Sequence, residues 1–529
     1  MGLTMPNLRD TLSYTPEELQ FGTSGLRALA TDMTDLECYI NTVGFLRFLV
    51  ESSKLPKGET VYLAGDLRES TPRITHAVAR AIRDEGYLVE YCGLVPTPTV
   101  SLYGFTHGKP SIMVTGSHIP ADRNGIKFIK PHDEALKEDE PGIKSSVAAV
   151  RAEIYAMESD NAPFNASGML KDPGSLPQAT SAAWELYAKR YQEVFPSTTL
   201  AGKKIVFYQH SAVGRDLLPE LFEALGATVE RVGRSEVFIP IDSENVTDRD
   251  EAYFLELSKQ FPDALAIVST DGDSDRPFVI DEHGQFHRGD MLGVVVAEWL
   301  KADFATFPVS ASDAADGRLT ADGVSWKHTR IGSPYVIRSM KDALAAGKRR
   351  VVGWEVNGGF LLGSDLDVEG GRLGPLPTRD AFVAILGALV TASESNRTIS
   401  EVFAALPQRY TQAGLINDFP TTVSQEMERR YSDDDETTRQ ELAGYFSGKH
   451  GFGTITSINT LDGIRIFFSN GDIAHLRPSG NAPQLRVYSV ADSQERANEI
   501  VDMTLAEPNG IFRRMQREIS QQQSAAHTA

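Results

Sequence analysis

The sequence predicts an α/β protein made of several segments in which strands and helices alternate, followed by a last segment of another kind. Up to about residue 409, short apolar runs of strand length are separated by amphipathic stretches of helical length. Strands joined by helices of that length indicate βαβ units with largely parallel sheets. From about residue 411, apolar runs follow one another through short turns, which is typical of antiparallel hairpins. The 529 residues leave room for several domains of about 100–200 residues each.

The first segment shows the alternation most clearly. Its predicted helices are residues 36–52, 71–85 and 146–157, and its predicted strands are residues 60–64, 87–92 and 111–114. From residue 131 to residue 180 the pattern gives way to charged residues, Pro, Gly and Ser, which we interpret as an excursion and a linker. The first domain is therefore expected at residues 1–180.

The alternation then restarts twice. In the second segment we predict helices at 181–194, 217–225 and 291–300, and strands at 204–208, 227–232 and 264–268. In the third segment we predict strands at 306–310 and 350–356 and helices at 333–344 and 379–391. The second domain is expected at residues 181–303 and the third at residues 304–409. The similar order of elements in the three segments suggests duplicated domains.

The fourth segment, residues 410–529, is predicted to be an α+β domain. We expect helices at 424–446 and 493–507 and strands at 453–456, 463–468 and 484–490. Its Gln-rich end, residues 521–529, is expected to be frayed or disordered. A second excursion, residues 433–448, has no explanation from the pattern.

Composition and charge exclude several classes of protein. The apolar content of 41% and charged content of 23% are ordinary for a soluble globular protein. No stretch of about 18 uncharged apolar residues and no basic leader are present, so we expect no membrane span and no signal peptide. With only Cys38 and Cys92, a reduced cytoplasmic setting is expected, both side chains being small and buried. The formal charge of -20 argues against a nucleic-acid partner, and an anionic substrate would need a local basic pocket.

The loop DGDSDR, residues 271–276, carries the strongest chemical signal. It follows the apolar run 264–268, and ligands of open α/β sheets bind where strands end. Asp271, Asp273 and Asp275 can turn inward around one hard cation, because Mg²⁺ and Ca²⁺ prefer oxygen ligands. Arg276 offers a fork for a phosphate or carboxylate. A metal beside an anion site suggests phosphate chemistry.

Two other interpretations of this loop stay open. It can be a solvated acidic turn. It can also be an EF-hand, because Glu282 falls twelve positions along, counting Asp271 as the first. An EF-hand, however, wants Gly at the sixth position and helices on both sides, whereas this loop has Arg276, then Pro277, and flanks that resemble strands.

A serine follows the strand 111–114, in the stretch TGSHIP at residues 115–120. Ser117 on a tight turn can be exposed for phosphoryl transfer if a cation neutralises the phosphate oxygens. His118 and Lys127 supply donors or acid/base groups. Asn124 and Gly125 form a turn signal expected to fold Lys127 back toward the same place. The alternative is a helix-capping serine beside a surface histidine.

Two further stretches could bind an anion. The stretch FGTSGLR, residues 21–27, offers a backbone cradle ahead of Arg27, or else an ordinary turn. The stretch RPSGNAP, residues 477–483, precedes the strand with Arg486. Arginine there can grip phosphate bidentately. The alternative is a hairpin turn with a solvated arginine.

A last stretch, GWEVNGG at residues 353–359, offers polar side chains after a strand. Glu355 and Asn357 are expected on the same side of an extended chain, where a carboxylate and an amide suit a pair of sugar hydroxyls. A polar pair on an edge strand is the alternative.

In this order, the five stretches resemble the α-D-phosphohexomutase family, which includes phosphoglucomutases and phosphomannomutases. The similarity runs from Phe21 to Tyr488. It implies four domains around a central cleft, namely three related mixed α/β domains and a C-terminal α+β domain that binds phosphate. It also implies a cytoplasmic monomer or homodimer that acts on a sugar phosphate, with neither nucleic acid nor membrane as a partner.

The resemblance further implies a mechanism that interconverts hexose 1-phosphate and hexose 6-phosphate. A phosphoserine passes its phosphoryl group to the substrate, the resulting 1,6-bisphosphate reorients, and its other phosphoryl group returns to the serine; hexose 1,6-bisphosphate also serves as activator. The implied catalytic residues are Ser117, Lys127, Arg27 and His118. The implied ligands of Mg²⁺ are Asp271, Asp273, Asp275 and Ser117. The implied substrate-binding residues are Glu355, Asn357, Arg276, Arg477, Ser479, Gly480, Asn481 and Arg486.

The chain departs from the family at several positions. Many relatives read Ala-Ser-His-Asn-Pro around the nucleophile, whereas this chain has Gly116 and Ile119. The sugar loop lacks the histidine of bacterial phosphomannomutases, and Asn481-Ala482 replaces a common Thr-Glu. The nucleophile and metal ligands are retained, so mutase chemistry is expected while the sugar stays open. A phosphopentomutase, a phosphoglucosamine mutase and a non-catalytic phosphosugar-binding relative are the alternatives.

Overall fold

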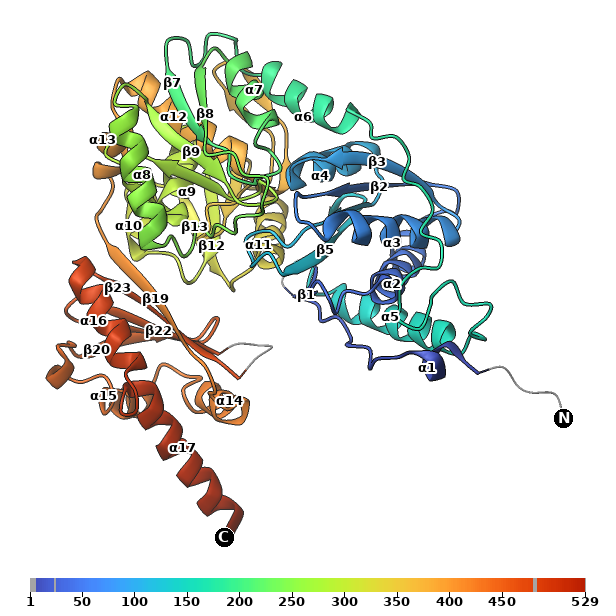
Figure 1. Ribbon diagram of the computed structural model, residues 1–529. Coiled ribbons are helices and arrows are strands. Elements are labelled where there is room, and N and C mark those ends of the chain that lie inside the picture. The colour runs from blue at the N-terminus through green and yellow to red at the C-terminus, as the bar shows by residue number, and fades with distance from the viewer. Residues whose placement is uncertain (1–5, 23–24, 479–482, 529) are drawn as a thin grey trace. The chain divides into compact units, whose positions relative to one another are not determined.

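The structure is a computed structural model that describes residues 6–22, 25–478 and 483–528, with the backbone only for residues 525–528. It contains two compact units (Figure 1). Unit 1 comprises Met1–Thr306 and Gly332–Phe403, and unit 2 comprises Phe307–Ile331 and Ala404–Ala529.

The first sheet of unit 1 is mixed. Its strand order is β1-β5-β4-β2-β3, with β6 paired to β5. The pairs β2–β3 and β2–β4 are parallel, whereas β4–β5 and β1–β5 are antiparallel. The strands are β1 (Leu26–Leu29), β2 (Thr60–Gly65), β3 (Leu88–Leu94), β4 (Ser111–Val114), β5 (Arg123–Lys130) and β6 (Asp133–Glu134).

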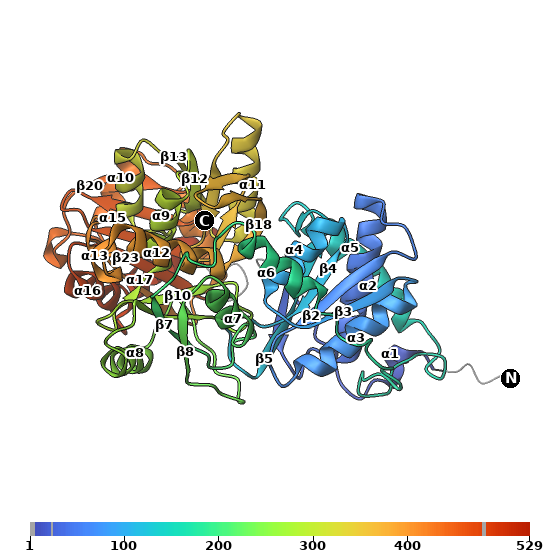
Figure 2. The same cartoon turned by 90° about the horizontal axis from the view of Figure 1, so that it is seen from above.

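The two central strands of this sheet, β2 and β4, are buried on both faces, which explains why they are almost entirely apolar. Because side chains alternate along a strand, Val61 and Leu63 of β2 enter one hydrophobic cluster and Tyr62 and Ala64 enter another. Helices α2, α3 and α5 lie on one side of the sheet, and α4 and α6 lie next to each other on the other side (Figures 1 and 2). The helices of this part are α1 (Leu8–Thr11), α2 (Asp35–Ser53), α3 (Thr71–Asp84), α4 (Thr97–His107), α5 (Glu140–Tyr155) and α6 (Ala182–Gln192).

The second sheet carries the acidic loop. Its order is β11-β10-β9-β7-β8, with β7 parallel to β8 and β9, and β10 antiparallel to β9. Every residue of β9 and β10 is buried. The elements are β7 (Lys204–Tyr208), α7 (Leu217–Ala224), β8 (Thr228–Val232), α8 (Asp248–Gln260), β9 (Ala266–Thr270), β10 (Pro277–Ile280) and β11 (Phe286–His287).

The third sheet runs β12-β14-β15-β18 in unit 1. β12 and β14 are parallel, and the following pairs are antiparallel. Its elements in unit 1 are α9 (Gly289–Trp299), β12 (Phe304–Pro308, crossing into unit 2), α11 (Ser333–Ala345), β14 (Val351–Trp354), β15 (Phe360–Leu362), β16 (Leu366–Val368), β17 (Gly371–Leu373), β18 (Leu376–Asp380), α12 (Ala381–Ser395) and α13 (Ile399–Ala404, whose last residue belongs to unit 2).

Unit 2 holds an antiparallel sheet in the order β19-β23-β22-β21-β20. The predicted hairpin from residue 453 to residue 468 is confirmed by the β20–β21 pair. The elements of unit 2 are α10 (Asp313–Ala321), β13 (Ser325–Thr329), β19 (Tyr410–Ile416), α14 (Thr421–Arg430), α15 (Glu436–Ala443), η1 (Gly448–His450), β20 (Ile455–Asn459), β21 (Ile464–Phe468), β22 (Ile473–Pro478), β23 (Leu485–Ala491), α16 (Gln494–Leu505) and α17 (Ile511–Thr528). The predicted class, mixed α/β sheets followed by an α+β part, is confirmed.

Two predictions about unit 2 were wrong. Residues 424–446 form two helices rather than one, because the Asp435 side chain accepts from Thr438 N and caps a new helix, α15. The Gln-rich end is not frayed over residues 521–528, because α17 continues to Thr528. One face of α17 is buried in the core through Ile511, Phe512, Met515 and Ile519.

Other findings bear on the predictions from composition. Both cysteines are free and buried, as expected, and burial raises the pKa of the Cys92 thiol to about 12. Within the described residues, no helix combines the length and the apolar character that crossing a membrane requires.

Candidate active site

The acidic loop joins β9 to β10 in a tight conformation that its own side chains support. Asp271 accepts hydrogen bonds at Oδ1 from the backbone N of Asp275 and of Arg276, both at 3.1 Å. Ser274 has the left-handed φ of 57°, and its Oγ accepts from Gly214 N at 3.0 Å. The flanking elements are strands, so the structure excludes the EF-hand interpretation.

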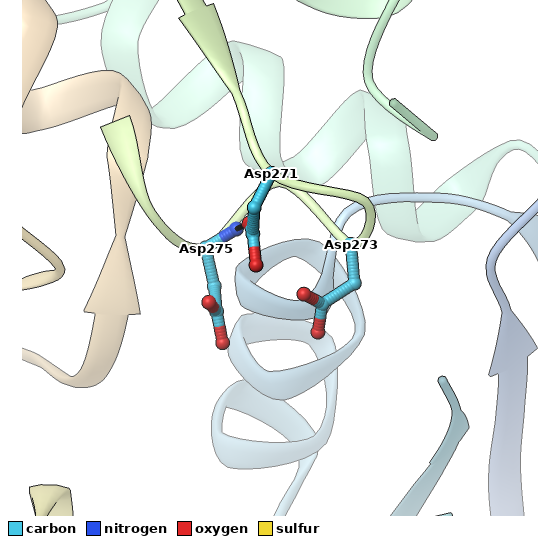
Figure 3. A group of neighbouring side chains, drawn as sticks. All are labelled: Asp271, Asp273 and Asp275. Atoms are coloured by element: carbon cyan, nitrogen blue, oxygen red, sulfur yellow. Dashed lines mark hydrogen bonds between the residues drawn. The ribbon is translucent and has the colours of Figure 1, made fainter. Parts of the chain in front are cut away.

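The three aspartates of this loop converge, as Figure 3 shows. One ligand oxygen from each of Asp271, Asp273 and Asp275 lies within 4.8 Å of the others, and all three residues are buried. Asp273 Oδ1 and Asp275 Oδ1 are buried and accept no hydrogen bond from any described residue. Buried carboxylate oxygens without donors suit a cation, since an unpaired buried charge is costly. The donor set, all oxygen, fits Mg²⁺.

Ser117 lies against this loop. After β4, Thr115 Oγ1 accepts from Ser117 N at 2.8 Å and helps to hold the left-handed φ of 54° at Ser117. Ser117 Oγ donates to Asp271 Oδ2 at 2.6 Å, although the two residues are 154 positions apart. The structure therefore brings the serine and the acidic triad together. The serine was expected to be exposed, but it is fully buried, because the acidic loop covers it.

The predicted turn at Asn124 and Gly125 was wrong. Both residues lie inside β5, opposite Ala28 and Arg27 of β1. A Cβ at Gly125 would lie 2.3 Å from Leu26 O, so glycine serves the close approach of the two strands and not a turn. The chain reverses earlier, where Arg123 N donates to Pro120 O at 3.1 Å.

Lys127 reaches the triad from β5. Its Nζ donates to Asp273 Oδ2 at 2.5 Å and to Asp275 Oδ2 at 2.6 Å. Burial opposes the ammonium charge, but the two carboxylates outweigh it and raise the pKa of Lys127 above its ordinary value. Thr97 Oγ1, at the start of α4, also donates to Asp273 Oδ2 at 2.5 Å.

Arg379 is a central residue of the site that the sequence reasoning missed. Its Nε and Nη2 donate to Asp275 Oδ2 at 3.1 and 2.7 Å, and its Nη1 donates to Glu355 Oε2 at 2.6 Å. The pattern had placed Arg379 in a helix, whereas it lies at the end of β18 and α12 begins at Ala381. The signal was Asp380, whose side chain caps α12 by accepting from Phe382 N.

The segment 242–244, also missed, links Arg276 to the sugar loop. Asp242 Oδ1 accepts from Arg276 Nη1 at 3.2 Å, and Glu244 Oε1 accepts from Asn357 Nδ2 at 3.1 Å. The extended chain expected at Glu355 and Asn357 was wrong. β14 ends at Trp354, and Gly358 N donates to Glu355 O at 2.9 Å in a turn, so the two side chains have different partners.

Charge is unevenly spread over this site. Burial and repulsion from Asp273 and Asp275 raise the pKa of Asp271 well above its usual range. Burial also acts on Asp275, but Arg379, Lys127 and Arg276 outweigh it and hold the pKa of Asp275 below its usual range. Lys127 and Arg379 thus contact Asp275, whereas Asp271 accepts from Ser117 and has only Arg276 among these cations nearby, at 3.8 Å.

The nearby arginines also shift the pKa values of two predicted acid/base candidates, His118 and Arg27. Burial first, and then Arg276, Arg27 and Arg379, place the pKa of His118 far below its ordinary value, so its imidazole is neutral. His118 Nδ1 lies 3.4 Å from Ser117 Oγ. Burial, with repulsion by Arg276 and Arg379, lowers the pKa of Arg27 to about 10.

The remaining predicted residues lie in unit 2. Arg477 on β22 pairs directly with Arg486 on β23, and directly opposite residues of an antiparallel pair project to the same face. Arg477 Nε donates to Asp462 Oδ2 at 3.2 Å, and Arg486 is exposed. Ser479, Gly480 and Asn481 lie outside the described residues, as do Thr23 and Ser24 of the stretch before Arg27.

Comparison with known proteins identifies the family. Models of the phosphoglucomutase/phosphomannomutase family match residues 18–153 (alpha/beta/alpha domain I), 288–410 (alpha/beta/alpha domain III) and 425–507 (C-terminal domain). A phosphomannomutase of Sinorhizobium fredii is 37% identical over 92% of this chain and 98% of its own length. A phosphomannomutase of Salmonella muenchen is 39% identical over 92% of this chain and 95% of its own length.

A solved structure agrees in fold. The phosphoglucomutase/phosphomannomutase family protein of Burkholderia thailandensis covers 98% of each chain with a TM-score of 0.67 at 17% identity, a likeness that concerns the fold alone. Together with the matched family models and the two phosphomannomutases, the ordered loops place the chain in the phosphoglucomutase/phosphomannomutase family, the α-D-phosphohexomutases.

Proposed function

We propose that this protein is a Mg²⁺-dependent phosphohexomutase that interconverts a hexose 1-phosphate and the corresponding 6-phosphate, as a phosphomannomutase, a phosphoglucomutase or both. The observation that carries the proposal is the 2.6 Å hydrogen bond from Ser117 Oγ to Asp271, a member of the buried acidic triad. A nucleophile in contact with a cation-binding carboxylate is the arrangement that phosphoryl transfer needs. The 37–39% identity to two phosphomannomutases supports the same activity.

Asp271, Asp273 and Asp275, with the oxygen of Ser117, are the proposed ligands of Mg²⁺. When bound, the ion neutralises the charge that develops on the phosphoryl oxygens. Lys127 and Arg379 keep Asp275 ionised and oriented through the contacts described above. They therefore fix the ligand geometry that the aspartates alone, repelling one another, would not hold.

The proton is the next requirement. When Ser117 accepts a phosphoryl group from the bisphosphate, its Oγ–phosphorus bond forms, the ester bond to the sugar oxygen breaks, and the Oγ proton must leave. Of Lys127, Arg27 and His118, only His118 is neutral, and its Nδ1 lies 3.4 Å from Oγ. We assign His118 to take this proton and to pass it to the sugar oxygen, which leaves as a hydroxyl group; in the reverse step the proton returns by the same route. Lys127 and Arg27 are assigned to stabilise phosphate charge.

Substrate recognition is assigned to two regions. In unit 1, Glu355 and Asn357 are proposed to contact sugar hydroxyls, with Arg276 beside the metal loop. In unit 2, the β22–β23 hairpin is proposed to bind the phosphate that does not react. Its residues are Arg477, Ser479, Gly480, Asn481 and Arg486. The proposal also includes four domains, at residues 1–180, 181–303, 304–409 and 410–529. It further includes a cytoplasmic location, a monomeric or homodimeric state, and hexose 1,6-bisphosphate as the activator.

The test is a panel of sugar phosphates. Purified protein is incubated with Mg²⁺, a trace of hexose 1,6-bisphosphate and the 1-phosphates of mannose, glucose, glucosamine and a pentose, and the isomers are separated. We expect conversion of mannose 1-phosphate or glucose 1-phosphate, together with protein heavier by one phosphoryl group in intact mass spectrometry. Preference for glucosamine or pentose phosphate would move the assignment within the family, and no conversion of any of them would overturn it.

A further inference from the structure

Arg68 lies directly under the loop that carries Ser117. Its side chain is completely buried. Its guanidinium donates to four backbone carbonyls of that loop: Nη1 to Pro120 O at 2.6 Å and Arg123 O at 2.9 Å, and Nη2 to Ser117 O at 2.9 Å and Ile119 O at 2.6 Å. The planar fork of arginine is rigid, so one side chain fixes the path of the loop from residue 117 to residue 123.

Gly116 makes room for this guanidinium. A Cβ at residue 116 would lie 2.7 Å from Arg68 Cζ and 2.7 Å from its Nε. The guanidinium cannot move aside without losing its carbonyl partners. Glycine at 116, where many family members have alanine, is therefore the residue that fits Arg68 in this chain.

Phe238 also lies against the guanidinium. Arg68 Cζ lies 3.9 Å from the centroid of the Phe238 ring, a distance at which a desolvated cation is attracted to an aromatic ring. Phe238 also touches the acidic loop, since a Cβ at Gly272 would lie 2.7 Å from the ring. The ring thus lies against both the residue that supports the serine loop and the loop that holds the aspartates.

An ion pair and two hydrogen bonds tie the same arginine to the serine backbone. Arg68 Nε lies 3.3 Å from Asp66 Oδ2, which accepts from Thr115 Oγ1 at 2.7 Å. Thr115 Oγ1 in turn accepts from Ser117 N at 2.8 Å. Ser117, with its left-handed φ of 54°, is therefore held at both its N–H and its carbonyl. A non-glycine residue keeps such a conformation only when its surroundings dictate it.

We propose that Arg68, which packs against Gly116 and Phe238, is a positioning residue of the phosphoryl-transfer step and holds Ser117 Oγ at Asp271. This inference rests on the proposed function. Arg68 does not touch the reacting atoms. It acts through the loop backbone, so its loss displaces Oγ from the triad while the sugar-binding residues keep their places. The signature is a lower kcat at an almost unchanged KM.

The test is a double-mutant cycle on the full-length protein, with Arg68→Lys, Gly116→Ala and the double variant. Lysine keeps the charge beside Asp66 but lacks the fork. We expect each single variant to lower kcat about 10- to 100-fold, since a displacement of about 1 Å can cost that much, with a parallel loss in the rate at which hexose bisphosphate phosphorylates Ser117. In the double variant, Gly116→Ala should cost little beyond Arg68→Lys, because the methyl group then no longer meets a guanidinium.

A matched control separates positioning from general stability. Arg151 is another buried arginine of unit 1, whose guanidinium pairs with Glu37 away from the serine loop. Arg151→Lys should lower the melting temperature and leave kcat unchanged. Additive losses in the double variant, unchanged kcat in Arg68→Lys, or an equal kcat loss in Arg151→Lys would each overturn the inference. A wild-type protein without any phosphoryl exchange would instead overturn the proposed function.

Discussion

The acidic triad of unit 1 and the β22–β23 hairpin of unit 2 both concentrate charged side chains, but the two regions differ in how those side chains are arranged. In the triad, Lys127 and Arg379 pair with buried carboxylates, and the ligand oxygens lie within 4.8 Å of one another. In the hairpin, Arg477 and Arg486 project from directly opposite positions to the same face, and Arg477 Nε donates to Asp462 Oδ2 at 3.2 Å. The side chains of the triad region are therefore held in place before anything binds. In the hairpin, by contrast, two arginines on one face form a surface that a bound anion would stabilise. This contrast suits a site where chemistry occurs and a site where phosphate is bound and released.

Removing the serine tests the organised region most severely. Ser117→Ala deletes the Oγ that Asp271 accepts from, and we expect turnover to fall about 10⁴-fold or more, as for other nucleophiles. The variant should also take up no phosphoryl group in intact mass spectrometry. Ser269→Ala is the control, since this buried serine of β9 donates only to backbone carbonyls. Phosphorylated Ser117→Ala protein would contradict the assignment.

Removing one carboxylate tests whether the triad binds metal. Asp273→Asn leaves Oδ1 of Asp275 without its neighbouring charge, so we expect Mg²⁺ affinity to fall about 10- to 100-fold by titration calorimetry. EDTA should abolish turnover in the wild type, and added Mg²⁺ should restore it. Asp281→Asn is the control. Asp281 is buried directly after β10, the strand that follows the acidic loop, but it pairs with His287 at 2.9 Å. Equal losses of affinity in both variants would contradict a site at the triad.

The acidic loop and the serine loop could be predicted from the sequence because their signals are local. Asp271, Asp273 and Asp275 alternate within a few residues, and Ser117 follows a short apolar strand, so chemistry and spacing are visible without the fold. Arg379 and the segment 242–244 were not visible. They meet Asp275, Arg276 and Asn357 only through packing of residues far apart in the chain.

Local signals also misled where tertiary pairing outweighed them. Asn124 and Gly125 have the composition of a turn, but pairing of β5 with β1 makes them strand residues. The single helix predicted over residues 424–446 was wrong for a local reason instead, because the Asp435 side chain caps a second helix there. For unit 2 the sequence indicated Arg477 and Arg486 as candidate phosphate ligands, but their direct opposition on β22 and β23 came from the structure.

Removing one arginine tests the hairpin. Arg477→Ala removes one of the two arginines on this face, and a charge-assisted bidentate contact is worth enough that we expect KM to rise about tenfold. The kcat should change much less, and raising the salt concentration should narrow the difference between wild type and variant. Arg439→Ala, which removes a surface arginine paired with Asp434 at 2.7 Å, is the control. A loss confined to kcat would contradict phosphate binding by the hairpin.

The smallest expected effect concerns acid stability, which two buried histidines of the described residues can report: His210 of unit 1 and His475 of unit 2. Burial lowers the pKa of His210 in unit 1 and of His475 in unit 2 from 6.5 to about 4. Their Nε2 atoms lie 2.7 Å from Thr270 O and 2.6 Å from Asp462 O. Because the unfolded chain binds these protons first, stability is complete above pH 6.5 and is lost as the pH falls toward 4.

Each histidine should therefore cost about 1–2 kcal/mol of unfolding free energy between pH 7 and pH 5. Denaturant titrations of wild type, His210→Gln and His475→Gln at several pH values measure this loss. Glutamine does not titrate, so each variant should lose less stability on acidification than the wild type, even if it starts lower. If only unit 2 lost stability in acid, through His475, then β22 would loosen. Sugar-phosphate binding would weaken at a pH at which the triad region of unit 1 is still intact. Equal slopes with pH in wild type and both variants would show that neither histidine is buried in its neutral form.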